Sequence, residues 1–287
     1  MAPVQTTNAA GRPLLVFEQE QQYRSASARA GYWGPVHSSI DWCERNYAVS
    51  FYVAEWFNTW SNVSMVVLGL VSVYLHWRER SERRYMATGF TLFLIGVGSA
   101  AFHGTLTHIG QQGDETPMVI GSAVWLWCLT FHDPAFEARH PRLGKQVAYV
   151  FSVLVGAFAV AHYVYSFVLV FQGLIAVMVV AMLASLSLKW RRARDPALAR
   201  PFALYWVTIL VAFPLWLCDQ HFCEHLHALP AGLPNPQFHA WWHLLMGANC
   251  YLGPVVEEPI RLAAKGRRPR VCWLGGCVPY VASRHEE

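Results

Sequence analysis

Apolar side chains fill long stretches of this sequence, and short polar connections separate them. A helix needs roughly 20 mostly apolar residues to cross the hydrocarbon core of a bilayer. Seven windows meet this requirement, and we expect each to form one membrane-spanning helix. They are residues 56 to 77, 85 to 105, 116 to 132, 146 to 163, 165 to 188, 201 to 218 and 237 to 256. The pattern predicts an all-α polytopic membrane protein, a seven-transmembrane helix bundle.

Composition agrees with a membrane protein rather than with a large soluble domain. The chain has 287 residues, of which 54% are hydrophobic and 14% are charged. Soluble domains carry about 25% charged residues, so a soluble enzyme of this size would have nearly twice the charge.

The basic residues predict the orientation of the bundle, because Lys and Arg favour the cytoplasmic side. Eighteen of the 22 basic residues lie in alternate connections or in the tail, at positions 78–84, 139–145, 189–200 and 261–284. The connections after helices two, four and six contain none. We therefore expect the amino terminus outside and the carboxyl terminus in the cytosol. The net charge of +4 reflects this bias, so we expect no nucleic-acid partner, and no obligate protein partner is evident.

The chain divides into three parts on these grounds. Residues 1–30 are rich in Ala, Ser, Gln and Thr and predict a flexible arm. Residues 31–260 form the helical membrane domain, and residues 261–287 form a basic cytosolic tail. Residues 1–20 lack the apolar core of a signal peptide, so we expect the first span to direct insertion.

Three cysteines, Cys43, Cys218 and Cys223, fall on or near the outer side. A bridge from Cys43 to Cys223 would tie the segment before the first span to the loop after the sixth. Because sequence does not fix cysteine connectivity, three unpaired thiols remain the alternative.

The stretch FHAWWH places two histidines at the start of the last span. Asn235 can cap this helix and Pro236 suits its first position. His239 and His243 then share one face, because residues four apart in a helix are aligned. Alone, the pair is compatible with a metal site or with histidines hydrogen-bonded to neighbouring helices.

Helix two supplies a third histidine in the stretch GSAAFHGTL. It runs from inside to outside, so His103 near its end reaches the depth of the pair, with Ser99 one turn below. Three histidines are the ligands of a catalytic zinc site whose fourth position holds water. Zinc lowers the pKa of that water toward ~7 and so generates hydroxide. The reaction also needs a carboxylate, which Asp114 or Glu115 could supply after helix two.

A third polar group precedes the first span, in the stretch DWCERNYAVSFYVAEWFN. Asp41, Glu44, Asn46 and Glu55 are hard oxygen donors suited to calcium. Their spacing is not that of an EF-hand, and solvated charges before a helix are the alternative.

Other polar residues receive simpler interpretations. We expect ordinary histidines in a solvated loop after helix six, a helix-end contact at Asp219, and headgroup-level charges at the inner end of helix seven. The residues are His221, Glu224, His225 and His227 in the loop, and Glu257 and Glu258 in helix seven.

Several blocks together resemble the alkaline ceramidase family of seven-span membrane hydrolases. They are GYWG at 31–34, DWCERNY at 41–47, AEWFNTWSN at 54–62, GSAAFH at 98–103, GDETPM at 113–118 and FHAWWH at 238–243. The blocks occur in that family's order and cover most of residues 31–260, whereas the first 30 residues and the tail lie outside them.

The resemblance implies roles for individual residues. His103, His239 and His243 look like zinc ligands, Ser99 like the residue that hydrogen-bonds the oxyanion, and Asp114, rather than Glu115, like the proton-transfer carboxylate. The implied calcium ligands are Asp41, Trp42 through its carbonyl, Glu44, Asn46 and Glu55.

The implied activity is hydrolysis of ceramide, dihydroceramide or phytoceramide to a sphingoid base and a fatty acid by zinc-activated water, with calcium in a structural and regulatory role. A seven-helix lipid-binding receptor, or a related hydrolase of another lipid ester or amide, is the alternative. We expect a location in the endoplasmic reticulum or Golgi membrane.

Overall fold

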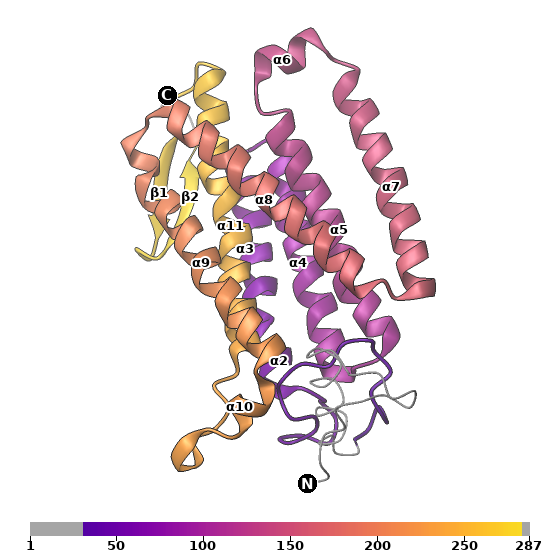
Figure 1. The fold of residues 1–287 in the computed structure, drawn as a ribbon. Helices are drawn as coiled ribbons and strands as arrows, with labels where there is room; N and C mark the ends of the chain where they lie inside the picture. Colours follow the sequence, from indigo (N-terminus) through magenta and orange to yellow (C-terminus); the bar gives the residue numbers. More distant parts are fainter. Residues whose placement is uncertain (1–30, 283–287) are drawn as a thin grey trace.

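Seven long helices form the body of the structure, a computed structural model that describes residues 31–282 (Figure 1). Each overlaps one of the predicted apolar windows. They are α3 (Val63–Arg78), α4 (Arg83–Thr105), α5 (His108–Thr130), α7 (Leu143–Tyr165), α8 (Val168–Ala193), α9 (Ala199–His221) and α11 (Phe238–Ala264). The shorter elements are α2 (Trp56–Ser61), α6 (Pro134–Arg139), α10 (Cys223–His227), the 3-10 turns η1 (Pro196–Leu198) and η2 (Pro230–Gly232), β1 (Arg270–Leu274) and β2 (Val278–Ala282).

Five stretches of the described chain are long and apolar enough to cross a membrane, which makes this a membrane protein. They are Trp56–Arg78, Arg83–Thr105, Leu143–Tyr165, Val168–Ala193 and Pro196–His221. Helices α5 and α11 are not among them, and both bury polar side chains such as Glu115 and His243.

Helix α11 lies among the other helices and packs against α2, α3, α4, α8 and α9 (Figure 1). Its apolar residues contact two separate groups of neighbours. Tyr251 and Val255 pack with Met65 of α3 and Leu92 of α4. Leu252 and Val256 pack with residues of α5, α8 and α9, namely Leu129, Met182, Leu186 and Tyr205. A helix with apolar contacts on two sides is held rigidly, which suits it to carry site residues.

Helix α11 starts two residues later than the cap at Asn235 predicts. The helix begins at Phe238, and Gln237 before it has a φ of 58°. Asn235 does not cap the helix, because its side-chain oxygen accepts from the backbone N–H of Gln237 at 2.9 Å. Its amide nitrogen donates to the carbonyl of Cys43 at 3.2 Å. Asn235 therefore joins the connection before α11 to the segment around Cys43.

Glu257 and Glu258 are not headgroup-level charges, because both are fully buried where α11 meets α3, α4 and the end of α5. Glu257 accepts from the Tyr85 hydroxyl at 2.5 Å and also contacts His132. Glu258 lies 3.3 Å from Nε2 of His76. Hydropathy placed these acids at the membrane surface, but their partners come from other helices and are invisible in the local sequence.

A second polar network joins the connections at the same end. Arg261 of α11 donates to Glu82 before α4 at 2.8 Å and to Glu137 of α6 at 2.6 Å. Burial alone would raise the pKa of Glu82, but hydrogen bonds from Arg261 and Lys265 outweigh it and lower the pKa to about 2. The connection between α3 and α4 and the short helix α6 are thus both fixed to the end of α11.

The region predicted as a basic tail begins within α11 and continues into an antiparallel hairpin of β1 and β2. The Tyr251 hydroxyl of α11 donates to the carbonyl of Pro279 at 2.7 Å. The Arg200 guanidinium lies 3.9 Å from the Trp273 ring centroid, and Arg78 lies 5.0 Å from that of Tyr280. The hairpin therefore rests on three helices.

Residues 31–55 form an irregular segment over the opposite end of the bundle. The backbone N–H groups of Ala54 and Glu55 donate to the carbonyls of Gly104 and His103, at 3.0 and 2.9 Å. These are carbonyls that the end of a helix leaves without intrahelical partners. A disulfide joins Cys43 to Cys223, so the alternative of three unpaired thiols is wrong. The predicted flexible arm, residues 1–30, lies outside the described residues.

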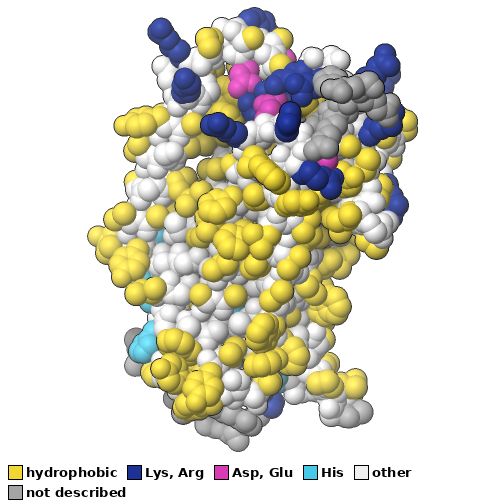
Figure 2. Space-filling model, turned by 180° about the vertical axis from the view of Figure 1, so that it is seen from behind, with side chains coloured by type: hydrophobic (Ala, Val, Ile, Leu, Met, Phe, Trp, Pro, Cys, Tyr) yellow, Lys and Arg dark blue, Asp and Glu magenta, His cyan; other side chains and the backbone are white. Residues whose placement is uncertain are grey.

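Polar and apolar surfaces are separated along the molecule (Figure 2). Hydrophobic side chains cover the middle of the face shown, and Lys and Arg side chains gather at the end that carries α6. Such a division between an apolar girdle and a basic end is the pattern that a bilayer selects.

Candidate functional site

The structure brings three predicted residues, His103, His239 and His243, into one cluster. One ligand nitrogen of each ring lies within 4.8 Å of the others. The ring centroids are 4.5 to 5.0 Å apart. The exposed fractions are 0% for His103 and 3% for the other two. Three imidazoles buried at this spacing can be ligands of one ion.

Hydrogen bonds orient the ring of His103. Its Nδ1 lies 2.5 Å from Oε2 of Glu55, which is itself completely buried. Glu55 also accepts from the N–H of Trp42 and from the amide of Asn58, both at 3.1 Å. Because three donors surround this carboxylate, we assign the proton to Nδ1 of His103. Nε2 then carries the lone pair; it is buried and has no hydrogen-bond partner within residues 31–282.

A hydrogen bond with Ser61 orients the ring of His243. Its Nδ1 lies 2.8 Å from the Ser61 hydroxyl, which donates its single proton to the carbonyl of Asn58 at 2.9 Å. We therefore assign the proton to Nδ1 of His243, which donates to Ser61, so Nε2 is left as the ligand atom. A ligating histidine usually donates its other N–H to such a partner, which fits a metal ion between the rings.

His239 is held by the segment that precedes the bundle. The Trp42 indole stacks on its ring, with centroids 3.6 Å apart and an angle of 14° between the planes. The Asp219 carboxylate of α9 accepts from the backbone N–H of His239 at 3.2 Å and from the backbone N–H of Cys43 at 3.1 Å. Asp219 is thus more than a helix-end contact, because it joins α9, α11 and the segment at the cluster.

Ser99 and Asp114 also meet in the structure, with the Ser99 hydroxyl beside the Asp114 carboxylate. Asp114 lies in the second turn of α5, whereas the sequence placed it at the entrance to that helix, which begins earlier than predicted. Its neighbour Glu115 is oriented elsewhere, because Gln111 donates to it at 3.0 Å and His162 of α7 contacts it. Of the two acids, Asp114 is the one that pairs with Ser99, the residue one turn from His103.

Close packing of α4 and α5 makes the contact between Ser99 and Asp114 possible. A Cβ atom added at Gly98 would lie 1.9 Å from the carbonyl oxygen of Gly113. Only glycine at position 98 permits such an approach of the two backbones. The small residues of the stretch GSAAFHGTL therefore bring the two polar side chains together.

The predicted calcium ligands are buried together beside this cluster. Asp41, Glu44, Asn46 and Glu55 are between 0% and 6% exposed. Burial, with the charge of Glu55, raises the pKa of Glu44 to about 8. Oδ1 of Asn46 is buried and finds no hydrogen-bond partner in the described part of the chain. An orphaned oxygen beside mutually repelling carboxylates fits a bound cation.

These oxygens are not yet arranged as a closed ligand set. The Glu44 carboxylate accepts from the N–H groups of Phe57 and Asn58, both at 2.8 Å, at the start of α2. The amide nitrogen of Asn46 lies 3.1 Å from both oxygens of Asp41. Among the described residues, the side-chain oxygens of Asp41, Glu44 and Glu55 do not lie as close to one another as the ligand nitrogens of the three histidines do.

The loop after α9 shows one contact that the sequence did not predict. Nε2 of His227 lies 2.7 Å from the carbonyl of Cys43. His227 also lies beside the sulfurs of Cys43 and Cys223, but the disulfide occupies both of them. The group therefore fastens the segment of residues 31–55 and offers no thiolates to a metal.

Fold and site together define a helical membrane protein with a buried three-histidine centre and a neighbouring serine–carboxylate pair. The ceramidase family model matches residues 34–282, and the chain belongs to this family. It is 33% identical to an Arabidopsis thaliana protein named alkaline ceramidase, over 89% of this chain and 96% of that relative. It is 32% identical to mouse alkaline ceramidase 3, over 88% and 95% of the two chains. A yeast relative, alkaline ceramidase YPC1, is 33% identical over 82% and 80%.

We predict that Gly98→Ala destabilises the protein and separates Ser99 from Asp114. The added methyl group must displace the backbone of Gly113, and overpacking of this kind costs about 1–3 kcal/mol. Thermal unfolding of the purified protein measures the loss. Gly156→Ala is the control, because a Cβ atom at this position of α7 meets nothing within 4 Å. Equal melting temperatures for the two variants would contradict the argument.

Proposed function

We propose that this protein is a zinc-dependent amide hydrolase that cleaves ceramide-type lipids to a fatty acid and a sphingoid base. The observation that carries the proposal is the buried cluster of His103, His239 and His243, whose ligand nitrogens lie within 4.8 Å of one another. Membership of the ceramidase family supports the substrate class.

The three histidines would hold zinc, with Nε2 of His103 and His243 as ligand atoms. Bound zinc supplies a Lewis acid that acidifies a water molecule and polarises a carbonyl oxygen. Burial of all three rings keeps bulk water away from the centre. Because the effective dielectric constant is lower in a buried site than in water, charges there interact more strongly.

Asp114 and Ser99 carry out the proton transfer and the stabilisation of charge. Asp114 takes a proton from the attacking water as the new C–O bond forms at the amide carbonyl. Ser99 donates a hydrogen bond to the oxygen that becomes negative. Asp114 then protonates the nitrogen as the C–N bond breaks, so the amine leaves as a neutral sphingoid base.

The proposed membrane arrangement has seven crossings, with α5 and α11 as the two polar ones. The basic end that carries α6 (Figure 2) then faces the cytosol, and the histidine cluster lies toward the outer side. A lipid with two chains would enter laterally among the helices and present its amide to the cluster. We place the protein in the endoplasmic reticulum or Golgi membrane, where the outer side is the lumen.

Calcium would bind the segment of residues 41–55 in a structural and regulatory role. The ligand atoms would be oxygens of Asp41, Glu44, Asn46 and Glu55, with the carbonyl of Trp42. Glu55 would belong to both sites, because its Oε2 atom is hydrogen-bonded to Nδ1 of His103. The segment would then position the His103 ring more firmly when the cation is bound.

We predict that His243→Ala removes zinc and abolishes release of sphingoid base. Zinc is measured by elemental analysis of the purified protein, and products are measured by mass spectrometry with ceramide, dihydroceramide and phytoceramide. His225→Ala is the control, because this histidine is exposed on α10. Full activity of His243→Ala would refute the zinc assignment. A wild-type protein that cleaves none of the three lipids would refute the substrate class.

We predict that Asp114→Asn keeps zinc and lowers kcat by about 10²–10⁴, the usual contribution of a general acid–base group. The amide preserves the shape of the side chain but cannot accept the proton of the attacking water. Glu115→Gln should reduce kcat much less, because Glu115 contacts Gln111 and His162 instead of Ser99. The assignment fails if the two variants lose activity equally with zinc retained.

We predict that Glu44→Gln abolishes stimulation by calcium and leaves the zinc content unchanged. Glu44 contacts Phe57 and Asn58 but none of the three histidines, so only the cation site should lose a charged ligand. Activity is titrated with calcium after chelation, with Glu224→Gln of α10 as the control carboxylate. Loss of zinc together with calcium would show that the two sites cannot be separated.

A further inference from the structure

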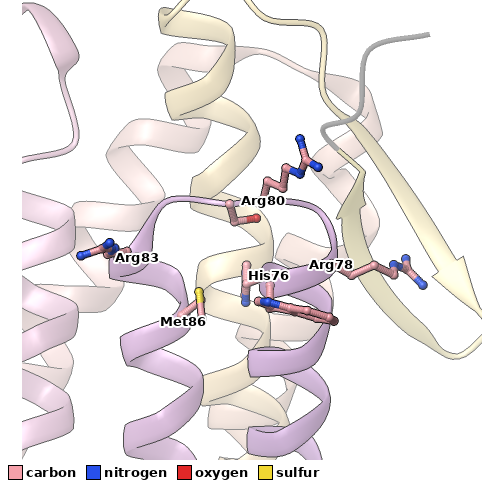
Figure 3. A pocket seen from close by; sticks show the side chains of 7 residues that line it. His76, Arg78, Arg80, Arg83 and Met86 are labelled. Carbon is pink, nitrogen blue, oxygen red and sulfur yellow. The ribbon is translucent and has the colours of Figure 1, made fainter. Parts of the chain in front are cut away.

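A pocket of about 600 Å³ opens beside the turn between α3 and α4, at the basic end of the molecule (Figure 3). Its volume is in the range that holds small ligands. It lies at the end of α4 opposite to His103, and none of its lining residues belongs to the histidine cluster. The lining comes from His76, Trp77, Arg78, Arg80, Ser81, Arg83 and Met86.

Two arginines at this pocket carry charge that no carboxylate of the described residues offsets. Arg80 and Arg83 are exposed, and within residues 31–282 neither is paired with an acid. The nearby acids already have partners, because Arg78 binds Glu79 at 2.9 Å and Arg261 binds Glu82 at 2.8 Å. The pocket therefore has a net positive charge that a bound anion would neutralise.

Neutral donors at the same turn suit an anion as well. The Ser81 hydroxyl is buried and makes no hydrogen bond inside the described part of the chain. The Glu82 side chain does not cap α4, whose first turn begins at this pocket. Uncapped N–H groups at the start of a long helix attract negative charge.

The backbone fixes the position of Arg80. Its φ is 55°, a left-handed conformation that usually requires glycine or asparagine. The N–H of Ser81 donates to the carbonyl of His76 at 2.9 Å and closes the turn. Figure 3 shows Arg80 and Arg83 leaving the turn in different directions, with His76 and Met86 between the two helices. An anion between the guanidinium groups would draw the two long side chains together.

The pocket also has an apolar wall at the expected level of the lipid headgroups. Trp77, the only tryptophan of α3, is 65% exposed, and Met86 of α4 also lines the pocket. Exposed tryptophan at the end of a spanning helix is typical of the membrane interface. A ligand with a charged head and an apolar body can use both parts of this pocket.

We propose that this pocket binds the phosphomonoester headgroup of an anionic membrane lipid. Arginine guanidinium groups recognise phosphate by charge and by paired hydrogen bonds. Basic residues that face the cytosol next to spanning helices attract anionic lipids of that leaflet. We choose a lipid over free phosphate because Trp77 and Met86 offer contacts that only an apolar body can use. The proposal uses the membrane orientation given above and does not depend on hydrolysis.

The test measures lipid binding to the purified full-length protein by native mass spectrometry and by thermal stabilisation. The probes are dioctanoyl phosphatidic acid, dioctanoyl phosphatidylcholine and inorganic phosphate. We expect wild type to prefer phosphatidic acid over phosphatidylcholine. The double variant Arg80→Gln/Arg83→Gln should bind phosphatidic acid about 10- to 30-fold more weakly, given the contribution of each basic residue near an anionic surface.

Two further variants control for charge and for folding. Arg142→Gln/Lys145→Gln removes the same charge from exposed positions at the start of α7, and it should bind like wild type. Arg80→Lys/Arg83→Lys keeps the charge and should retain most of the binding. The proposal is overturned if both Gln variants weaken binding equally, if phosphatidylcholine binds as well as phosphatidic acid, or if inorganic phosphate stabilises wild type as strongly as the lipid.

Discussion

The short hydrogen bond between Nδ1 of His103 and the buried carboxylate of Glu55 connects the two halves of the site. One partner belongs to α4 and the other to the end of the irregular segment that covers the bundle. Removing one member of such a pair leaves the other buried without its counterpart, which is costly. The orientation of the His103 ring, and with it the proposed zinc centre, therefore depends on where that segment lies.

Several independent contacts hold the segment in place. The disulfide from Cys43 to Cys223 ties it to α10, and Asp219 accepts from the N–H groups of Cys43 and His239. The Trp42 indole covers the ring of His239. Because these contacts converge on the histidine cluster, the segment forms part of the site instead of being a separate lid. A calcium ion on its carboxylates would act through the same contacts, since Glu55 belongs to both groups.

The sequence allowed the main helices and the pair His239 and His243 to be predicted, because apolar length and i, i+4 spacing are local signals. His103 followed from the direction of its helix, which brings it to the depth of the pair. The sequence did not reveal the partners of buried acids. Glu257 and Glu258 looked like surface charges, yet Tyr85, His132 and His76 reach them from other helices. The role of Asp219 was missed for the same reason. The resemblance suggested Asp114 over Glu115, and the structure adds a physical reason, since Asp114 lies beside Ser99 whereas Glu115 contacts Gln111 and His162.

The most direct test of the central claim is zinc K-edge X-ray absorption on the purified protein, for wild type and for Glu55→Gln. We predict that wild type binds one zinc through three imidazole nitrogens at about 2.0–2.1 Å, with an oxygen ligand in the fourth position. Glu55→Gln should weaken zinc binding by about 10- to 100-fold, as loss of a partner of a ligating histidine does in other sites. Sulfur in the first coordination shell, absence of zinc from wild type, or unchanged affinity in the variant would contradict the account.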